Sequence, residues 1–398
     1  MYIIREEYLK KLFELKDSDL IKVVTGVRRC GKSTLFVQFQ DYLIKRGILK
    51  EQIIYINFED YDNEKYLEPK ALYEHIKSLI KPGRKNYIFL DEIQNVKDFQ
   101  KVVDSLYIKK EVDLYITGSN AYFLSSDLAT LLSGRYIEIK MLPLSFKEYV
   151  LNSGSKDNLE TKYRDYILNG SFPYTLELKN NERVVKDYLE GLLNTIVIKD
   201  IIQRNNFNDV ILFQSVLKYL FDNIGNLVSS KKIADSLTSN GRKVDSKTIE
   251  RYLNALIVSF VIYRASRFNI KGKEYLKSLE KYYVVDIGLR HALLGQSNID
   301  VGHMLENIVY LELIRRGYDV YVGKYNDLEI DFVAKDDKNI SYFQVAATVR
   351  DENVLKRELA PLRSIKDQYP KFLLTLDNDP DTDFNGIKKL NVLEWLIN

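Results

Sequence analysis

Apolar residues in the first third of the chain occur in two arrangements: short β-branched runs, and longer stretches at helical spacing. The short runs predict strands at 20–25, 53–58, 87–90 and 114–117. The longer stretches predict helices at 33–46 and 71–80. Because strands that alternate with helices pair in parallel, we expect an α/β domain with a parallel sheet over residues 1–141.

From residue 142 the pattern is mostly helical, interrupted by Pro143 and by the segment Gly170-Ser171-Phe172-Pro173. We expect a helical lid over 142–209. Within 210–297, three helix-like segments precede an apolar run, and this order predicts a winged helix-turn-helix. The four segments are 213–224, 231–237, 246–258 and 260–263.

The final part, 298–398, predicts a small α/β domain. Its helix is expected at 302–317 and its strands at 318–322, 328–333, 341–345 and 371–376. The full length of 398 residues exceeds the ~250–300 residues at which one hydrophobic core stops growing, which agrees with several domains.

The composition is that of a folded protein without a membrane span. Hydrophobic residues make up 45% and charged residues 29%, and 29 Tyr and 18 Phe argue against long disordered stretches. The single cysteine, Cys30, cannot form an internal disulfide, and no run of about 18 apolar residues occurs, so we expect a cytoplasmic protein. The net charge of +3 is too small to indicate nucleic-acid binding by itself.

The first predicted strand leads into a loop bounded by Gly26 and Gly31, after which Lys32 and Ser33 begin a helix. Glycines let successive backbone N–H groups point at phosphate oxygens, and the helix N-terminus adds its positive dipole end. We expect Lys32 to reach the β- and γ-phosphates of ATP and Ser33 to bind Mg²⁺. The residues expected to bind the nucleotide are Gly26, Val27, Arg28, Arg29, Cys30, Gly31, Lys32, Ser33 and Thr34.

The third predicted strand ends in the acidic pair Asp91-Glu92. An aspartate at such a strand end can hold the water shell of Mg²⁺, so Asp91 is the expected metal partner. Glu92 is then well placed to orient or deprotonate the attacking water. In combination with Lys32, the pair predicts ATP hydrolysis and not nucleotide binding alone.

Six segments together resemble the AAA-type ATPases of bacteria and archaea that join a P-loop module to a C-terminal restriction-endonuclease-like domain of unknown function. The segments are Gly-Val-Arg-Arg-Cys-Gly-Lys-Ser at 26–33, Ile-Asn-Phe-Glu-Asp at 56–60, Phe-Leu-Asp-Glu-Ile-Gln at 89–94, Thr-Gly-Ser-Asn at 117–120, Leu-Ser-Gly-Arg at 132–135 and Leu-Pro-Leu-Ser-Phe-Lys-Glu-Tyr at 142–149. The resemblance covers nearly the whole chain and implies the P-loop NTPase fold.

The same resemblance implies roles for three further residues. Asn120, or Ser119, would contact the γ-phosphate or the attacking water, although both are also ordinary turn residues. Arg135 would act as a sensor or arginine finger, in cis or from a neighbouring subunit. A solvated surface arginine is the alternative for Arg135.

The predicted winged helix carries a local excess of positive charge, with six basic and three acidic residues over 229–251. The basic residues are Lys231, Lys232, Arg242, Lys243, Lys247 and Arg251. Lys247 and Arg251 lie one turn apart on the last predicted helix and could meet DNA phosphates without reading bases. The alternative is a winged helix used for packing or for protein contact.

Four residues near the C-terminus follow the layout of PD-(D/E)xK nucleases: Glu306 on a helix, Glu329 and Asp331 entering a strand, and Gln344 on the next strand. Such enzymes need carboxylates for Mg²⁺ and a lysine for the nucleophile. Ala346 stands where the lysine belongs, so we expect a nuclease-inactive scaffold, unless Lys335 or Arg350 takes the role.

Three functions remain open on the sequence. The first is an ATP-driven switch or motor coupled to double-stranded DNA. The second is a signalling ATPase whose C-terminal parts bind a protein partner. The third is an ATP-dependent nuclease, for which the missing lysine is the obstacle. All three share ATP and Mg²⁺, and none involves a membrane.

Overall fold

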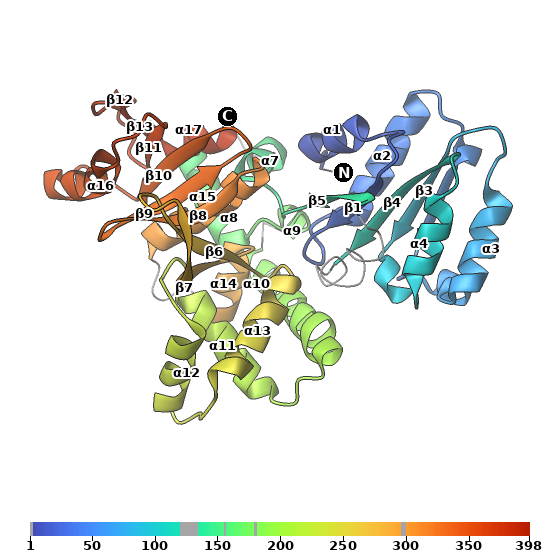
Figure 1. Cartoon of the computed structure of the whole chain (residues 1–398), viewed down its shortest axis with the longest axis horizontal. Coiled ribbons are helices and arrows are strands. Elements are labelled where there is room, and N and C mark those ends of the chain that lie inside the picture. The colour runs from blue at the N-terminus through green and yellow to red at the C-terminus, as the bar shows by residue number, and fades with distance from the viewer. Residues whose placement is uncertain (1–2, 120–133, 155–156, 179–180, 296–299) are drawn as a thin grey trace. The chain divides into compact units, whose positions relative to one another are not determined.

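The computed structural model of the chain describes residues 3–119, 134–154, 157–178, 181–295 and 300–398. The chain forms two compact units (Figure 1): Met1–Pro143 with Val258–Phe260, and Leu144–Ile257 with Val261–Asn398. The main segment of the first unit therefore ends two residues beyond the domain predicted at 1–141. Apart from 258–260, the later predicted parts lie in the second unit from Leu144 onward.

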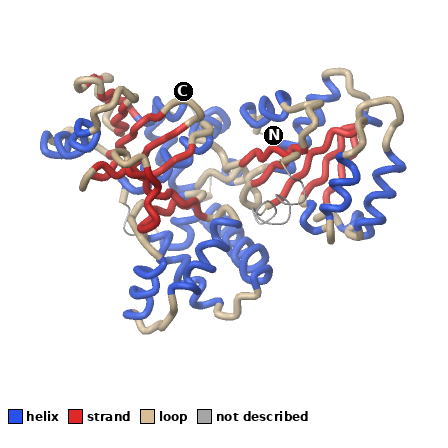
Figure 2. The backbone as a smooth tube through the Cα atoms, in the orientation of Figure 1, coloured by secondary structure: helices blue, strands red, loops and turns tan. Residues whose placement is uncertain are grey.

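The first unit is built on a sheet whose strands are drawn in red in Figure 2. The sheet has five strands in the order β2-β3-β4-β1-β5, and all neighbouring strands are parallel. The strands are β1 (Ile21–Thr25), β2 (Ile53–Asn57), β3 (Asn86–Asp91), β4 (Val112–Gly118) and β5 (Tyr136–Lys140). The sheet confirms the predicted α/β fold class. The hydrophobic pattern predicts β1 to β4 but not β5, because Tyr-Ile-Glu-Ile-Lys has no continuous apolar run.

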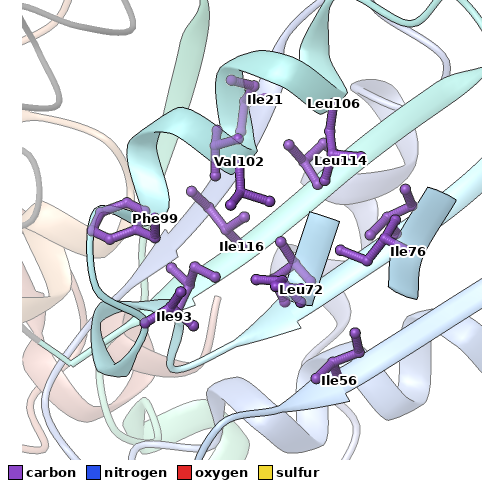
Figure 3. Packing of buried hydrophobic residues seen from close by; sticks show 14 of the residues in the cluster. Ile21, Ile56, Leu72, Ile76, Ile93, Phe99, Val102, Leu106, Leu114 and Ile116 are labelled. Carbon is purple, nitrogen blue, oxygen red and sulfur yellow. The ribbon is translucent and has the colours of Figure 1, made fainter. Parts of the chain in front are cut away.

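Helices cover both faces of this sheet. They are α1 (Glu6–Glu14), α2 (Lys32–Lys45), α3 (Pro69–Leu79) and α4 (Phe99–Tyr107), with 3₁₀ turns η1 (Lys50–Gln52), η2 (Tyr61–Tyr66) and η3 (Ile93–Asn95). On one face, Leu72 and Ile76 of α3 and Val102 and Leu106 of α4 are buried in one cluster with Ile116 of β4 (Figure 3). Each such side chain contributes roughly 1.5–3 kcal/mol relative to exposure.

The opposite face of the sheet holds α2. Successive strand residues point to opposite faces, so Phe89 and Tyr115 face away from that cluster. The ring of Phe36 lies 5.2 Å from that of Phe89, and the ring of Phe39 lies 5.3 Å from that of Tyr115. This aromatic packing fixes the helix whose first residue is Lys32.

The second unit begins with helices and ends with a mixed sheet. The helices after the main segment of the first unit are α7 (Phe146–Asn152), α8 (Leu159–Asn169), α9 (Thr175–Leu178), α10 (Glu182–Thr195), the π-helix η4 (Ile196–Gln203), α11 (Val210–Asp222), α12 (Ser230–Ser239), α13 (Ser246–Val258), α14 (Ile287–Leu294), α15 (Val301–Arg315), α16 (Glu352–Ser364) and α17 (Val392–Ile397). Among the described residues, none of the helices is both long and apolar enough to cross a membrane.

The sheet of the second unit has eight strands in the order β12-β13-β11-β10-β9-β8-β6-β7. They are β6 (Ile262–Asn269), β7 (Glu274–Val284), β8 (Asp319–Tyr325), β9 (Leu328–Lys335), β10 (Ile340–Ala346), β11 (Lys371–Thr375), β12 (Thr382–Asp383) and β13 (Ile387–Asn391). The antiparallel pair β6–β7 follows α11, α12 and α13, and β6 also pairs in parallel with β8. One sheet therefore crosses the boundary predicted at residue 297.

A buried ion pair joins two central strands of the first unit. The Lys22 ammonium on β1 lies 2.5 Å from Oδ1 of Asp113 on β4, and both side chains are fully buried. The Tyr115 hydroxyl and the Asp17 backbone N–H donate to the other oxygen of Asp113 at 2.8 and 2.9 Å. Each oxygen of this carboxylate therefore has a partner, as a buried charge requires.

Removing one partner of this pair should destabilise the first unit strongly. Lys22→Met leaves the Asp113 carboxylate buried without its ammonium, and we expect a loss of about 3–5 kcal/mol in the free energy of unfolding. The double variant Lys22→Met/Asp113→Leu should recover most of this loss, since it buries no charge. Urea unfolding followed by circular dichroism measures both.

The control is Lys10→Met, which removes the exposed 3.9 Å pair with Glu14 and should cost under about 1 kcal/mol. Equal effects of the two single variants would refute the argument.

Candidate functional site

The loop after β1 has the backbone that its glycines predict. Gly26 has a φ of 153° and Gly31 a φ of 109°, both in the region that favours glycine. A side chain at Gly26 would also collide with the chain, because its Cβ would lie 2.1 Å from the carbonyl oxygen of Met141. Helix α2 starts directly after Gly31, so the loop ends at a helix N-terminus.

Lys32 is buried and holds the loop from inside. Its ammonium donates to the carbonyl oxygens of Gly26 at 3.1 Å and Val27 at 3.3 Å. It also lies 3.3 Å from Oε1 of Glu92, which follows β3. Lys32 and Glu92, which the sequence predicts for one site, are therefore ion-paired in this structure.

Asp91 ends β3 with both carboxylate oxygens engaged. The Thr117 hydroxyl on β4 donates to Oδ1 at 2.5 Å, and the Tyr55 hydroxyl on β2 donates to Oδ2 at 2.9 Å. Burial and the charge of Asp91 raise the pKa of Tyr55, so this phenol remains a donor. Sequence reasoning missed Thr117 and Tyr55 because their roles depend on strand order, which the local pattern does not contain.

Glu92 adopts a left-handed backbone conformation, with a φ of 54°. Its N–H donates to the Thr117 hydroxyl at 2.9 Å, and its Oε2 accepts a hydrogen bond from Gln94 Nε2. The same Gln94 nitrogen lies 3.4 Å from the Ser119 hydroxyl at the end of β4. Ser119, an alternative for the predicted sensor, is thus linked to Glu92, whereas Asn120 lies outside the described residues.

The charges of this pair reinforce each other. Burial alone would raise the pKa of Glu92, but the Lys32 charge and the hydrogen bonds from Gln94 and Ser119 outweigh it, so the pKa is lowered. Burial alone would lower the pKa of Lys32, but the charge of Glu92 outweighs it, so that pKa is raised. Both groups are therefore ionised at neutral pH.

Arg5 is a site residue that the sequence did not reveal. Its buried guanidinium donates to the carbonyl oxygen of Cys30 in the loop at 3.0 Å. It also donates to the carbonyl oxygens of Leu142 at 2.8 Å and Pro143 at 3.3 Å, after β5. One side chain before α1 thus supports the loop and the segment that follows the sheet, a long-range contact without a local sequence signal.

Other loop residues have less direct placements. Arg28 forms an ion pair of 2.6 Å with Glu59, which lies in the resemblance segment 56–60. Cys30 is fully buried, and burial raises the pKa of its thiol. Arg29 is exposed with a φ of 65°, and Ser33 and Thr34 lie in the first turn of α2, half buried.

Arg135 is not brought to the phosphate loop. It precedes Tyr136, which pairs with Ile21 at the amino end of β1, whereas the loop leaves the carboxyl end. Its guanidinium lies over the ring of Tyr107, 5.4 Å from the ring centre. Five strand residues, about 16 Å, therefore separate it from its own loop.

The six basic residues predicted for DNA contact are all exposed on or between α12 and α13: Lys231, Lys232, Arg242, Lys243, Lys247 and Arg251. Lys232 donates to the carbonyl oxygen of Leu227 at 3.2 Å, and the guanidinium of Arg251 lies 5.6 Å from the ring centre of Phe207.

The carboxylates predicted near the C-terminus do converge, and a lysine lies among them. The ammonium of Lys281 on β7 lies 2.9 Å from Glu306, 2.8 Å from Glu329 and 3.9 Å from Asp331. The Tyr283 hydroxyl also donates to Glu306 at 2.6 Å. Sequence reasoning missed Lys281 because it precedes the motif and lies within 210–297, the part predicted as a winged helix-turn-helix, where no strand was expected at β7.

The other predicted groups are placed differently. Gln344 accepts from the Asp331 backbone N–H at 3.4 Å and donates to Glu358 at 3.0 Å. Lys335 lies over the ring of Phe268, and Arg350 pairs with Asp377 at 3.5 Å, so neither replaces the missing lysine. Within the described residues, no group of three or more His, Cys, Asp or Glu side chains is arranged to hold a metal ion.

Comparisons with known proteins agree with this geometry. Residues 18–150 match a family described as an AAA domain, and residues 160–300 match a domain of unknown function, DUF8612. A Haemophilus influenzae protein described as uncharacterized is 41% identical over 99% of this chain and 98% of its own length. An uncharacterized Methanocaldococcus jannaschii protein is 31% identical over 90% of this chain and 80% of its own.

A solved structure, the Walker-type ATPase of Pyrococcus abyssi, is similar with a TM-score of 0.51 and 16% identity, covering 73% of this chain and 96% of that chain. At this identity the similarity shows the fold alone. Together with the family match at 18–150, this similarity identifies the sheet and the phosphate loop of the first unit as those of an AAA domain. The chain belongs to the same family as the Haemophilus influenzae protein, and its N-terminal part is an AAA-type P-loop ATPase domain.

Proposed function

We propose that the chain hydrolyses ATP, with Mg²⁺, at the carboxyl ends of β1 and β3. One observation carries the proposal: Lys32, Asp91 and Glu92 form a single buried network. Lys32 lies 3.3 Å from Glu92, and the Thr117 hydroxyl bonds both Asp91 and the Glu92 backbone. Such a network supplies the cation, the metal-binding carboxylate and the base that hydrolysis needs.

Ser33 and Asp91 would hold Mg²⁺, because a hydroxyl and a carboxylate are the oxygen donors this ion prefers. The rigid support of Asp91 by Thr117 and Tyr55 fits that task. When bound, Mg²⁺ neutralises charge on the phosphates.

The Lys32–Glu92 pair gives ATP binding a direct consequence. Phosphate oxygens would compete with Glu92 for the Lys32 ammonium, which now has a carboxylate and two loop carbonyls as partners. Once Lys32 turns to the phosphates, the Glu92 carboxylate can accept a proton from the attacking water. Binding of the ATP phosphates by Lys32 would thereby free the Glu92 carboxylate to act as the base. We assign the sensor role to Ser119 or Asn120, and Arg135 would have to act from a neighbouring subunit.

Variants of this pair should separate binding from hydrolysis. Lys32→Ala should abolish both ATP binding and turnover, because the phosphates lose their cation. Glu92→Gln should keep ATP bound and lower kcat by about 100-fold or more. Turnover is measured by phosphate release and binding with a fluorescent ATP analogue, with and without EDTA. Full turnover in Lys32→Ala, or EDTA-insensitive turnover, would contradict the proposal.

We further propose that ATP turnover is coupled to duplex DNA through phosphate contacts of α12 and α13. The support is the exposure of all six basic residues on one short stretch of chain. Contacts of this type carry little sequence information, so binding should be strongly salt-dependent. The alternative partner is a protein.

Charge reversal should reveal the DNA surface. The triple variant Arg242→Glu/Lys243→Glu/Lys247→Glu should weaken duplex binding and lower the slope of log K against log salt by about 3. The matched control Lys338→Glu/Arg363→Glu/Lys366→Glu changes the net charge equally at exposed positions elsewhere in the second unit. Titration of labelled duplex at low and physiological salt measures both. Equal weakening in the two variants would refute this surface, and a wild type without binding at low salt would favour a protein partner.

For the C-terminal cluster we propose a structural role in place of cleavage. The Lys281 ammonium lies between Glu306 and Glu329 and serves as their internal counter-ion. Burial alone would lower the pKa of Lys281. The charges of Glu306, Asp331 and Glu329 outweigh this effect, so the pKa is raised. Burial and the charge of Glu306 raise the pKa of Asp331 well above its usual range, against the opposing charge of Lys281.

Lys281→Met should therefore destabilise the second unit in a pH-dependent way. Without the ammonium, the pKa of Asp331 in the folded state rises further, so the penalty is present at pH 8 and shrinks toward pH 5 as protons bind. At pH 8 we expect a loss of about 3–5 kcal/mol by urea unfolding. Lys335→Met, outside the cluster, should show no such pH trend. If Mn²⁺ stabilised the wild type, and a Mn²⁺-dependent nicking activity vanished in Asp331→Ala, a metal site for cleavage would replace this proposal.

A further inference from the structure

Gln94 holds an unusual position beside the acidic pair. It lies in η3, directly after β3, and its Nε2 donates to the Glu92 carboxylate and lies 3.4 Å from the Ser119 hydroxyl. Glu92 follows β3, and Ser119 follows β4. The amide of Gln94 therefore bridges two strand ends at the edge of the sheet where the phosphate loop lies.

The orientation of this amide is determined by its neighbours. If the group were turned over, its carbonyl oxygen would face the Glu92 carboxylate, and two acceptors would be in contact. The nitrogen must therefore face Glu92, which directs Oε1 elsewhere. Gln94 Oε1 is buried and has no hydrogen-bond partner among the described residues. A buried acceptor without a donor is unfavourable. Because Gln94 Oε1 lies next to the reacting groups, a water molecule bound there would supply the missing donor.

We infer that Gln94 orients the attacking water jointly with Glu92, an inference that rests on the proposed hydrolysis of ATP. A water molecule that attacks in line needs an acceptor for each hydrogen, so that a lone pair on oxygen faces the γ-phosphorus. Glu92 accepts the proton that leaves, and Gln94 Oε1 accepts the second hydrogen in a hydrogen bond. The donor that Oε1 lacks is then the reacting water itself.

The chemical step balances with these two groups. The water oxygen forms a bond to the γ-phosphorus while the bond from that phosphorus to the bridging oxygen of ADP breaks. One proton passes to the Glu92 carboxylate, and the other stays on the new phosphate. Gln94 gains and loses no proton, as expected for an amide, and Lys32 stays on the phosphates.

The test is the variant Gln94→Leu, which keeps an apolar side chain of similar volume and removes both polar atoms. We expect kcat to fall about 100-fold with unchanged KM for ATP and unchanged affinity for a fluorescent ATP analogue. Binding of ADP with beryllium fluoride, a ground-state mimic, should remain. Binding of ADP with aluminium fluoride, which mimics the transition state with the in-line water, should weaken.

The matched control is Gln40→Leu on α2. Gln40 also has a buried amide atom without a partner in the described part of the chain, but it lies two turns along the helix from Lys32. Its kcat should equal that of the wild type. Wild-type kcat in Gln94→Leu, an equal fall in Gln40→Leu, or equal weakening of both fluoride complexes would overturn the role of Gln94. A wild type no faster than Lys32→Ala would instead overturn the proposed hydrolysis itself.

Discussion

The hydroxyl group of Thr117 joins the two carboxylates on which the nucleotide site depends. It donates to Asp91 and accepts from the backbone of Glu92, so it spans two neighbouring strands. Glu92 has a positive φ, which is unfavourable for any residue with a side chain, and the bond to Thr117 compensates. Because β3 and β4 are parallel, their carboxyl ends meet at one edge, and one hydroxyl can serve both residues.

This constraint directs the Glu92 side chain toward Lys32. The phosphate loop is held independently by Arg5. Arg5 holds the carbonyl oxygen of Cys30 and, with the same guanidinium, those of Leu142 and Pro143. A shift of the loop would therefore have to move the segment after β5 or break charge-assisted hydrogen bonds. The main segment of the first unit ends at Pro143. Arg5 therefore connects the phosphate loop to the last residues of that segment.

The sequence predicts those parts of the site that are local in the chain. Two such parts are the loop Gly26 to Ser33 and the pair Asp91-Glu92, because each motif can be recognised from a few neighbouring residues. The strands that precede them are continuous apolar runs. Arg5 and Lys281 could not be predicted, because their partners lie as many as 138 residues away, and a lone basic residue has no pattern. β5 and β7 were hidden for a related reason, since charged residues interrupt their apolar positions.

The second unit shows how such hidden strands change the reading of a domain. β6 follows α13 directly, and β6 and β7 form an antiparallel pair, as the wing of a winged helix would. The same strands extend the C-terminal sheet through β8, and Lys281 of β7 pairs with Glu306 of α15. The basic helix is therefore attached to the sheet that carries the carboxylate cluster, without a linker between them.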